Sequence, residues 1–148
     1  MLMFTVGIAD PMMKRRHEII LPELLRREGF EVTVHEPGTP ITADGFEIAI
    51  YALAEETLLT RGRIFLDWAA IGGGQDGTMR RLWTDMPVVM ISFGFPYYLY
   101  DAPRVPTYIN AWATMDPMQH AVVDLLLGRA SWQGKSPVDA FVVPDAHY

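Results

Sequence analysis

Residues 87–98, with the sequence PVVMISFGFPYY, decide the fold. The part from 87 to 93 is apolar at nearly every position, as expected for a strand of a parallel sheet that helices cover on both faces. Gly94 and Pro96 follow directly, and these residue types favour turns because of their backbone conformations. A buried strand that ends in a turn is a unit of α/β folds, so this stretch predicts a parallel sheet.

Strand and helix patterns alternate on both sides of this stretch. Apolar, β-branched runs predict strands, and apolar residues three or four positions apart predict helices. Pro22 lies inside the first helical pattern, where it either kinks the helix or opens a second one. Together the patterns predict one domain over 1–148, a three-layer α/β/α sandwich with a mostly parallel sheet of about five or six strands. The predicted strands are 3–8, 30–35, 46–53, 87–93 and 108–111, with candidates at 64–68 and 137–143, and the predicted helices are 12–28, 76–85 and 116–128.

Composition restricts the partners and the chemistry. Half of the 148 residues are hydrophobic and the net charge is −6, which disfavours binding to a phosphate backbone, so no nucleic-acid partner is expected. The chain has no cysteine, which excludes disulfides, thiol catalysis and cysteine zinc sites. No apolar run is long enough for a membrane helix and the first residues do not resemble a signal peptide. We therefore expect no membrane contact, and a cytoplasmic location if the chain is complete.

A glycine-rich segment at 72–77 is the first candidate ligand loop. It lacks the Lys-Ser/Thr ending of a P-loop, and it follows only an uncertain strand, so a dinucleotide site is not predicted. Two interpretations stay open. The segment is a surface turn, or it faces a sugar pocket on a partner domain through Gly73, Gln75 and Asp76.

The turn after the strand 87–93 is the second candidate. Ligands of open α/β sheets bind at the carboxyl ends of the strands, which is where this turn lies. It is either a purely structural turn or a substrate contact made by Ser92, Gly94, Tyr97 and Tyr98. Tyrosine suits a sugar because its ring packs on an apolar ring face while its hydroxyl bonds to a polar edge.

No catalytic constellation emerges from the residues. The four histidines, His17, His35, His120 and His147, do not have the spacing of metal ligands, and the chain has no Gly-x-Ser-x-Gly nucleophile turn. We therefore predict no metal site, no cofactor and no catalytic residue on this chain.

Five features of the second half occur in an order that resembles a known family. They are the strand 88–93, the turn 94–98, the Tyr-Ile-Asn-Ala-Trp segment 108–112, the Ala/Val/Leu helix, and the Gly-Lys-Ser-Pro-Val segment 134–138. This order resembles the C-terminal α/β sandwich domain of family 3 glycoside hydrolases, in the β-N-acetylhexosaminidase (β-N-acetylglucosaminidase) branch. The turn departs from the usual pattern because Phe95 stands where a small residue is more common.

The resemblance implies a function through a partner. In that branch an Asp nucleophile and an Asp-His pair lie on a barrel domain that precedes the sandwich. This chain is then a non-catalytic accessory domain that packs against an N-terminal barrel and completes a pocket for N-acetylglucosamine-containing sugars. Alone it is expected to be inactive, although it is part of a glycoside hydrolase.

Three alternatives remain. In the β-glucosidase branch a Glu of the second domain acts as acid/base, a role in which Glu55 or Glu56 can be imagined. The chain is otherwise a free-standing flavodoxin-like module that binds a nucleotide, a flavin or a sugar. A homodimer is also possible when the domain is isolated, through an exposed apolar face with candidates Trp68, Trp83, Trp112 and Trp132.

Overall fold

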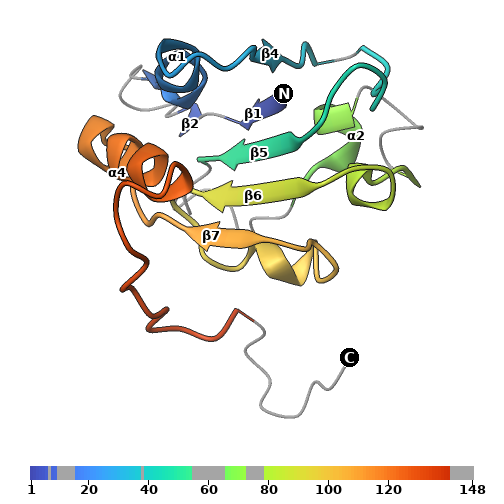
Figure 1. Cartoon of the computed structure of the whole chain (residues 1–148). Helices are drawn as coiled ribbons and strands as arrows, with labels where there is room; N and C mark the ends of the chain where they lie inside the picture. Colours follow the sequence, from blue (N-terminus) through green and yellow to red (C-terminus); the bar gives the residue numbers. More distant parts are fainter. Residues whose placement is uncertain (7, 10–15, 38, 55–65, 73–78, 141–148) are drawn as a thin grey trace.

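The computed structural model describes residues 1–6, 8–9, 16–37, 39–54, 66–72 and 79–140. Its centre is a five-stranded sheet in which every neighbouring pair is parallel, in the order β4-β1-β5-β6-β7 (Figure 1). The predicted α/β sandwich is therefore confirmed. The strands of this sheet are β1 (Leu2–Val6), β4 (Thr33–Val34), β5 (Ala49–Leu53), β6 (Val88–Ser92) and β7 (Tyr108–Asn110).

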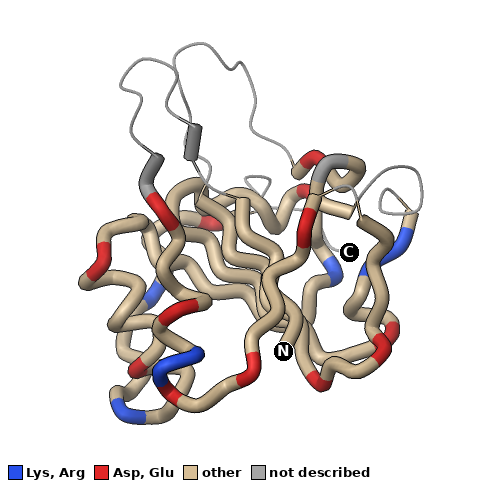
Figure 2. The backbone as a smooth tube through the Cα atoms, turned by 90° about the horizontal axis from the view of Figure 1, so that it is seen from above, with Lys and Arg blue, Asp and Glu red and all other residues tan. Residues whose placement is uncertain are grey.

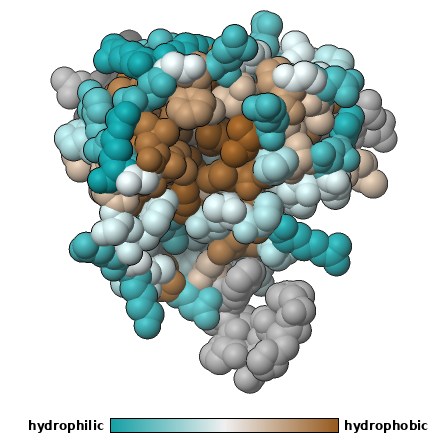
Figure 3. All heavy atoms as spheres, in the orientation of Figure 1, coloured by the Kyte–Doolittle hydropathy of each residue, from teal (hydrophilic) through white to brown (hydrophobic). Residues whose placement is uncertain are grey.

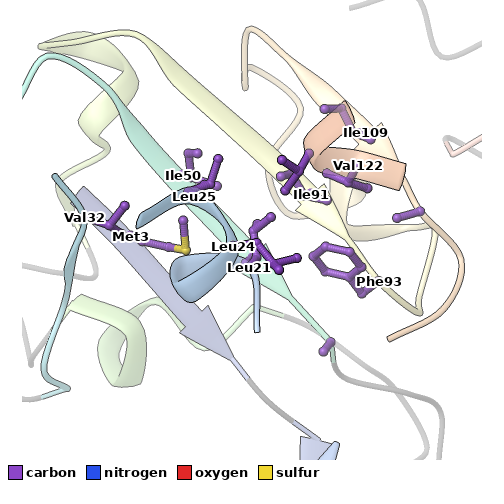
Figure 4. Packing of buried hydrophobic residues seen from close by; sticks show 14 residues of the cluster. Met3, Leu21, Leu24, Leu25, Val32, Ile50, Ile91, Phe93, Ile109 and Val122 are labelled. Atoms are coloured by element: carbon purple, nitrogen blue, oxygen red, sulfur yellow. The ribbon is translucent and has the colours of Figure 1, made fainter. Parts of the chain in front are cut away.

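Side chains alternate between the two faces of the sheet, and each face has its own core. On one face, residues such as Met3, Ile50 and Ile91 pack against α1 (Leu21–Arg27) and α4 (Asp116–Leu126) (Figure 4). On the other face, Tyr51 and Met90 lie in the cluster that includes residues of α2 (Trp68–Gly72) and of two short 3-10 helices, η1 (Leu82–Thr84) and η2 (Tyr98–Tyr100). The sheet is thus the middle of three layers.

The first helix is much shorter than predicted. The prediction was a helix over 12–28, but α1 begins at Leu21, with Pro22 in its first turn. Arg16–His17 form a short strand, β3, that pairs antiparallel with β2 (Ile8–Ala9). Proline has no N–H to donate and restricts the residue before it, so it is compatible with the first turn of a helix but not with its interior. Of the two options for Pro22, the structure shows the helix start.

Other predicted elements are also shorter or different. The run 64–68 is not a strand where it is described, because Trp68 begins α2 and an apolar run alone does not distinguish a buried helix from a strand. Within the described part of the predicted helix 76–85, Met79 is helical and Leu82–Thr84 form the 3-10 helix η1, while residues 76–78 lie outside the described part. Residues 137–140 form no strand, and 141–143 lie outside the described part. The predicted strand 30–35 is reduced to β4, at the edge of the sheet.

Gln119 of α4 joins the two helices of one face. Its side chain is fully buried, and its Oε1 accepts hydrogen bonds from the backbone N–H groups of Ile20 (2.8 Å) and Leu21 (3.0 Å). Its Nε2 donates to the carbonyl groups of Glu18 (3.1 Å) and Thr114 (2.7 Å). The N-cap residue of α1, Ile20, makes no side-chain hydrogen bond to the helix. The amide oxygen of Gln119 therefore accepts hydrogen bonds from N–H groups that the start of a helix leaves unpaired.

Replacing Gln119 with leucine should destabilise the fold. Q119L keeps a similar volume but leaves two N–H and two carbonyl groups without this partner, and we expect the free energy of unfolding to fall by about 3 kcal/mol. The neighbouring His120 is exposed, so H120A should change stability by less than about 0.5 kcal/mol. Urea denaturation of both variants tests the claim, and equal stabilities would contradict it.

His35 is a titratable group at the sheet edge with an unfavourable environment for its charged form. It follows β4, and its ring lies 4.6 Å from that of Phe4, measured between centroids. Its Nε2 is buried and has no hydrogen-bond partner. Burial lowers the pKa of His35 below its ordinary value, and the charge of Glu36 opposes this only in part. The folded protein therefore favours the neutral imidazole.

Stability should consequently decrease in mild acid. Above the unfolded pKa of about 6.5, His35 is neutral in both states and has no effect. As the pH falls below that value, the unfolded chain takes up the proton first, so stability is lost until the pH reaches the lower folded pKa. We expect H35F, which keeps a ring against Phe4, to lose less stability than the wild type between about pH 7.5 and about pH 5 in urea titrations. An equal loss in both proteins would contradict this.

Candidate functional site

The carboxyl ends of three strands meet at one edge of the sheet. Leu53 of β5 is in register with Ser92 of β6, and Ser92 is in register with Asn110 of β7. Because the strands are parallel, the turns that follow them gather at the same edge, which is where open α/β sheets bind ligands. The predicted turn after 87–93 lies here.

A polar network fixes this turn. The buried Ser92 hydroxyl donates to the carbonyl oxygen of Phe95 at 2.5 Å, and the Tyr108 hydroxyl donates to that of Pro96 at 3.0 Å. Burial is the main cause that raises the pKa of Tyr108 to about 12, so its hydroxyl is a donor at neutral pH. Ser92 therefore acts within the fold, closing the turn that follows its own strand.

The two adjacent tyrosines of the turn lie in different places. Tyr98 begins η2 and its side chain is fully buried, with its ring 5.5 Å from that of Phe95. Tyr98 is thus a core residue and is closed to a ligand in this structure. Tyr97 is half-buried and its ring also lies close to that of Phe95, at 5.3 Å between centroids. Phe95, the residue that departs from the family pattern, is therefore the packing centre of the turn.

The remaining candidates divide into two groups. Gly94 and Tyr97 are partly accessible at the sheet edge. Gly73, Gln75 and Asp76 of the glycine-rich segment lie outside the described residues, as do Glu55 and Glu56. The position of the glycine-rich loop is thus outside the described part, and a sugar contact through either of the two predicted loops stays a prediction.

The backbone of Trp112, just beyond the end of β7, has a conformation that sequence reasoning missed. Its φ is +66°, and Trp112 is the one residue other than glycine with positive φ in the described part of the chain. The N–H of Ala113 donates to the carbonyl of Ala111 at 2.8 Å, so the chain makes a three-residue γ-turn around Trp112. The side chain is 41% exposed. A strained backbone thus presents a large aromatic ring at the ligand-binding edge.

Asn110 adds a polar group beside this ring. It precedes the γ-turn at the end of β7, and its Oδ1 is buried without a hydrogen-bond partner. Buried polar atoms are usually paired, so this atom is an exception that coincides with the strained turn. Trp112 is one of the four tryptophans that the sequence analysis proposed for an exposed apolar face. No sequence feature, however, indicates its positive φ or the unpaired amide oxygen of Asn110.

Two substitutions of Trp112 separate strain from packing. W112A and W112G lose almost the same side-chain contacts, but only glycine adopts positive φ without steric cost. We expect W112G to be more stable than W112A by about 1 kcal/mol. Chemical denaturation measures the difference. If W112A is as stable as W112G, the left-handed conformation does not exist in solution.

Charged residues lie around the sheet and are absent from its five strands (Figure 2). Across the described ranges, no group of three or more His, Asp or Glu side chains is placed to hold a metal ion. The turns after β6 and β7 contain hydroxyl, amide and aromatic groups but no acid before Asp101 and Asp116. This edge therefore offers ring-packing surfaces and hydrogen bonds, the interactions with which proteins hold a sugar.

Comparisons with known sequences and solved structures find similarity over most of this chain. No protein-family model matches the chain. A β-N-acetylglucosaminidase/β-glucosidase from Cellulomonas fimi is 29% identical over 128 aligned residues, and the match covers 80% of this chain and 22% of that protein. A solved structure of the β-glucoside phosphorylase BglX is 28% identical with a TM-score of 0.74, over 95% of this chain and 26% of that chain, and the same phosphorylase bound to 2FGlc gives identical values.

The predicted resemblance to family 3 glycoside hydrolases is confirmed. Both the sequence and the three-dimensional match extend over most of this chain. The chain spans about a quarter of the length of these relatives, so it is similar to one part of a larger protein. No helix in the described portion is long and apolar enough to cross a membrane.

Proposed function

We propose that this chain is the non-catalytic C-terminal domain of a family 3 β-N-acetylhexosaminidase and that its carboxyl edge completes a sugar pocket on a partner barrel domain. The observation that carries the proposal is the share of the relatives that the chain covers. The match covers 80% of the 148 residues of this chain, about 118 residues, and 22% of the Cellulomonas fimi protein, which is therefore about 540 residues long. Most of such an enzyme lies outside the matched domain.

The chemistry of the edge supports an accessory role. Canonical glycosidases place two carboxyl groups on either side of the scissile bond. The turns after β6 and β7 provide Tyr97 and Trp112 instead, which suit packing against a sugar ring. A domain of this kind positions a substrate or shields it from water while another domain supplies the acid and the nucleophile.

An apolar surface over the sheet favours a contact with another domain. Figure 3 shows apolar residues gathered over β5 and β6, beside α1 and α4, where the surface is hollowed. Val89 of β6 is among the partly buried side chains of this face. Continuous apolar surface favours association with another protein surface, here a barrel domain of the same enzyme or a second copy when the domain is isolated.

The size of the native polypeptide tests the accessory role. An antibody against this domain should detect a band of about 60 kDa in the source cells, because the Cellulomonas fimi relative has about 540 residues whereas this chain has a mass of 16.7 kDa. A band near 17 kDa would overturn the proposal.

An activity assay tests whether this chain contains catalytic residues of its own. The isolated chain should not hydrolyse a nitrophenyl N-acetylglucosaminide. Hydrolysis that disappears in the double variant E55Q/E56Q would instead assign the acid/base role to this domain, as in the β-glucosidase branch. Hydrolysis that survives in that variant would show that other residues of this chain are catalytic.

The strand order favours a second candidate function. The order β4-β1-β5-β6-β7 is that of flavodoxin-like sheets, which bind a ligand beside the first strand where the order reverses. That point lies between β1 and β5, and most of the following turn residues, including 10–15 and 55–65, are outside the described part. A yellow purified protein with flavin absorbance would favour this binding module over the accessory domain.

A further inference from the structure

The two outer strands of the sheet differ in how their outer sides are covered. β4 and β7 lie at the two ends of the strand order, and Figure 1 shows β7 as the outermost strand, beyond β6. An outer strand has backbone N–H and carbonyl groups on one side that no strand of its own sheet pairs with. Such a strand can pair with a strand of another chain unless a side chain or another element blocks it.

On β4 a charged side chain blocks the outer side. The N–H groups of Thr33 and His35 donate to the neighbouring β1, so the carbonyl of Val32, one residue out of phase, faces away from β1. Arg26 of α1 covers this carbonyl, because its Nε and Nη2 donate to the oxygen at 3.2 Å and 2.8 Å. A charged side chain on an outer strand hinders pairing with another chain.

On β7 the outer side is open in the described part of the chain. The carbonyl of Thr107 and the N–H of Ala111 bond to β6. Alternate residues bond to the same neighbour in a parallel sheet, so the backbone groups of Tyr108 and Asn110 face away from β6. No described strand continues the sheet beyond β7. The N–H and carbonyl groups of these two residues can therefore pair with a further strand.

The sequence around β7 is uncharged and ends in two opposite charges. Residues 105–115 contain no Lys, Arg, Asp or Glu, although the chain has a net charge of −6. Arg104 precedes this segment and Asp116 follows it, and both are exposed. Because the two ends have opposite charges, the segment is complementary to a second copy of itself in the antiparallel orientation.

We propose that this chain forms a homodimer in which β7 pairs with β7 of a second copy, antiparallel and about a two-fold axis at Ile109. In this register Tyr108 of each copy is opposite Asn110 of the other. Both residues have outward backbone groups, so each pair exchanges both of its N–H to carbonyl hydrogen bonds. The opposite strand directions bring Arg104 of each copy toward Asp116 of the other.

A second copy fits this strand because a two-fold interface requires a self-complementary surface. The backbone pairing and the charges at the ends of the segment both meet that requirement. β7 has only three residues, so the hydrogen bonds are few and we expect a dissociation constant on the order of 10–100 µM. The dimer does not depend on the proposed accessory function, because the outer side of β7 is distinct from the carboxyl ends of the strands.

Sedimentation velocity of the full chain between about 5 µM and about 500 µM tests the dimer. The mass should rise from 16.7 kDa toward twice that value as the concentration passes the dissociation constant. A chain that stays monomeric at the highest concentration would overturn the proposal.

Amide hydrogen exchange followed by NMR locates the interface. The N–H groups of Tyr108 and Asn110 should exchange about threefold more slowly at about 500 µM than at about 20 µM, because only the dimer pairs them. The N–H of Ile109 faces β6 in both states and serves as the internal control. A dimer that leaves the exchange of Tyr108 and Asn110 unchanged associates through another surface, such as the apolar surface over the sheet, and contradicts the proposal.

A charge swap tests the antiparallel register. R104E and D116K each place like charges opposite one another, so either variant should weaken the dimer about tenfold. The double variant R104E/D116K restores opposite charges and should return the dissociation constant to within about threefold of the wild type. Arg27 on α1 is also exposed, and R27E should dimerise as the wild type does. Far-ultraviolet circular dichroism checks the fold of each variant. Equal losses in R104E and R27E, or no recovery in the double variant, would overturn this arrangement.

Discussion

The amide of Gln119 is the interaction on which one face of the structure depends. It makes four hydrogen bonds in the interior, one to Thr114 just before α4 and three to the beginning of α1, about a hundred residues away along the chain. At the other end of the pair, Arg129 binds Glu28 at the end of α1, with Nη1 and Oε1 at 2.9 Å. This second contact is exposed to water and is therefore worth much less than the buried amide. The two helices are short, so their mutual position relies on these tertiary contacts more than on helix propensity.

The parts of the fold that the sequence predicts are those with a strong local signal. The apolar runs that became β5 and β6 have no competing interpretation, and both strands are at the centre of the sheet. Pro117 lies in the first turn of α4, and Gly128, with φ of +70°, follows its end. Pro22 was recognised as an exception, but the periodicity before it favoured a helix where the chain forms β3. Pairing of β2 with β3 is a contact between two-residue segments, too short to leave a pattern in the sequence.

The candidate site was predictable in position but not in its details. The rule that ligands bind at carboxyl ends of parallel strands located the turn 92–98 correctly at that edge. It did not separate Tyr97 from Tyr98, because adjacent residues of a 3-10 turn point in different directions and only packing decides which is buried. The positive φ of Trp112 had no sequence signal, since glycine or asparagine normally occupies such positions. The partner of Gln119 was equally hidden, because a glutamine in a helix is usually exposed.

The two edges of this sheet differ in the groups that they present and in how those groups are bonded. The carboxyl edge presents the exposed ring of Trp112 on a backbone with positive φ, two residues after Asn110, whose Oδ1 is buried without a hydrogen-bond partner. At the amino edge, Arg80 pairs with Asp85, and Asp101 accepts a hydrogen bond from the backbone N–H of Leu66. A strained, exposed residue suits a surface that another domain completes, because strain is tolerated where the surroundings impose it. The described contacts of the amino edge join residues of this chain instead, so they stabilise the fold, and the parallel sheet keeps the two edges apart.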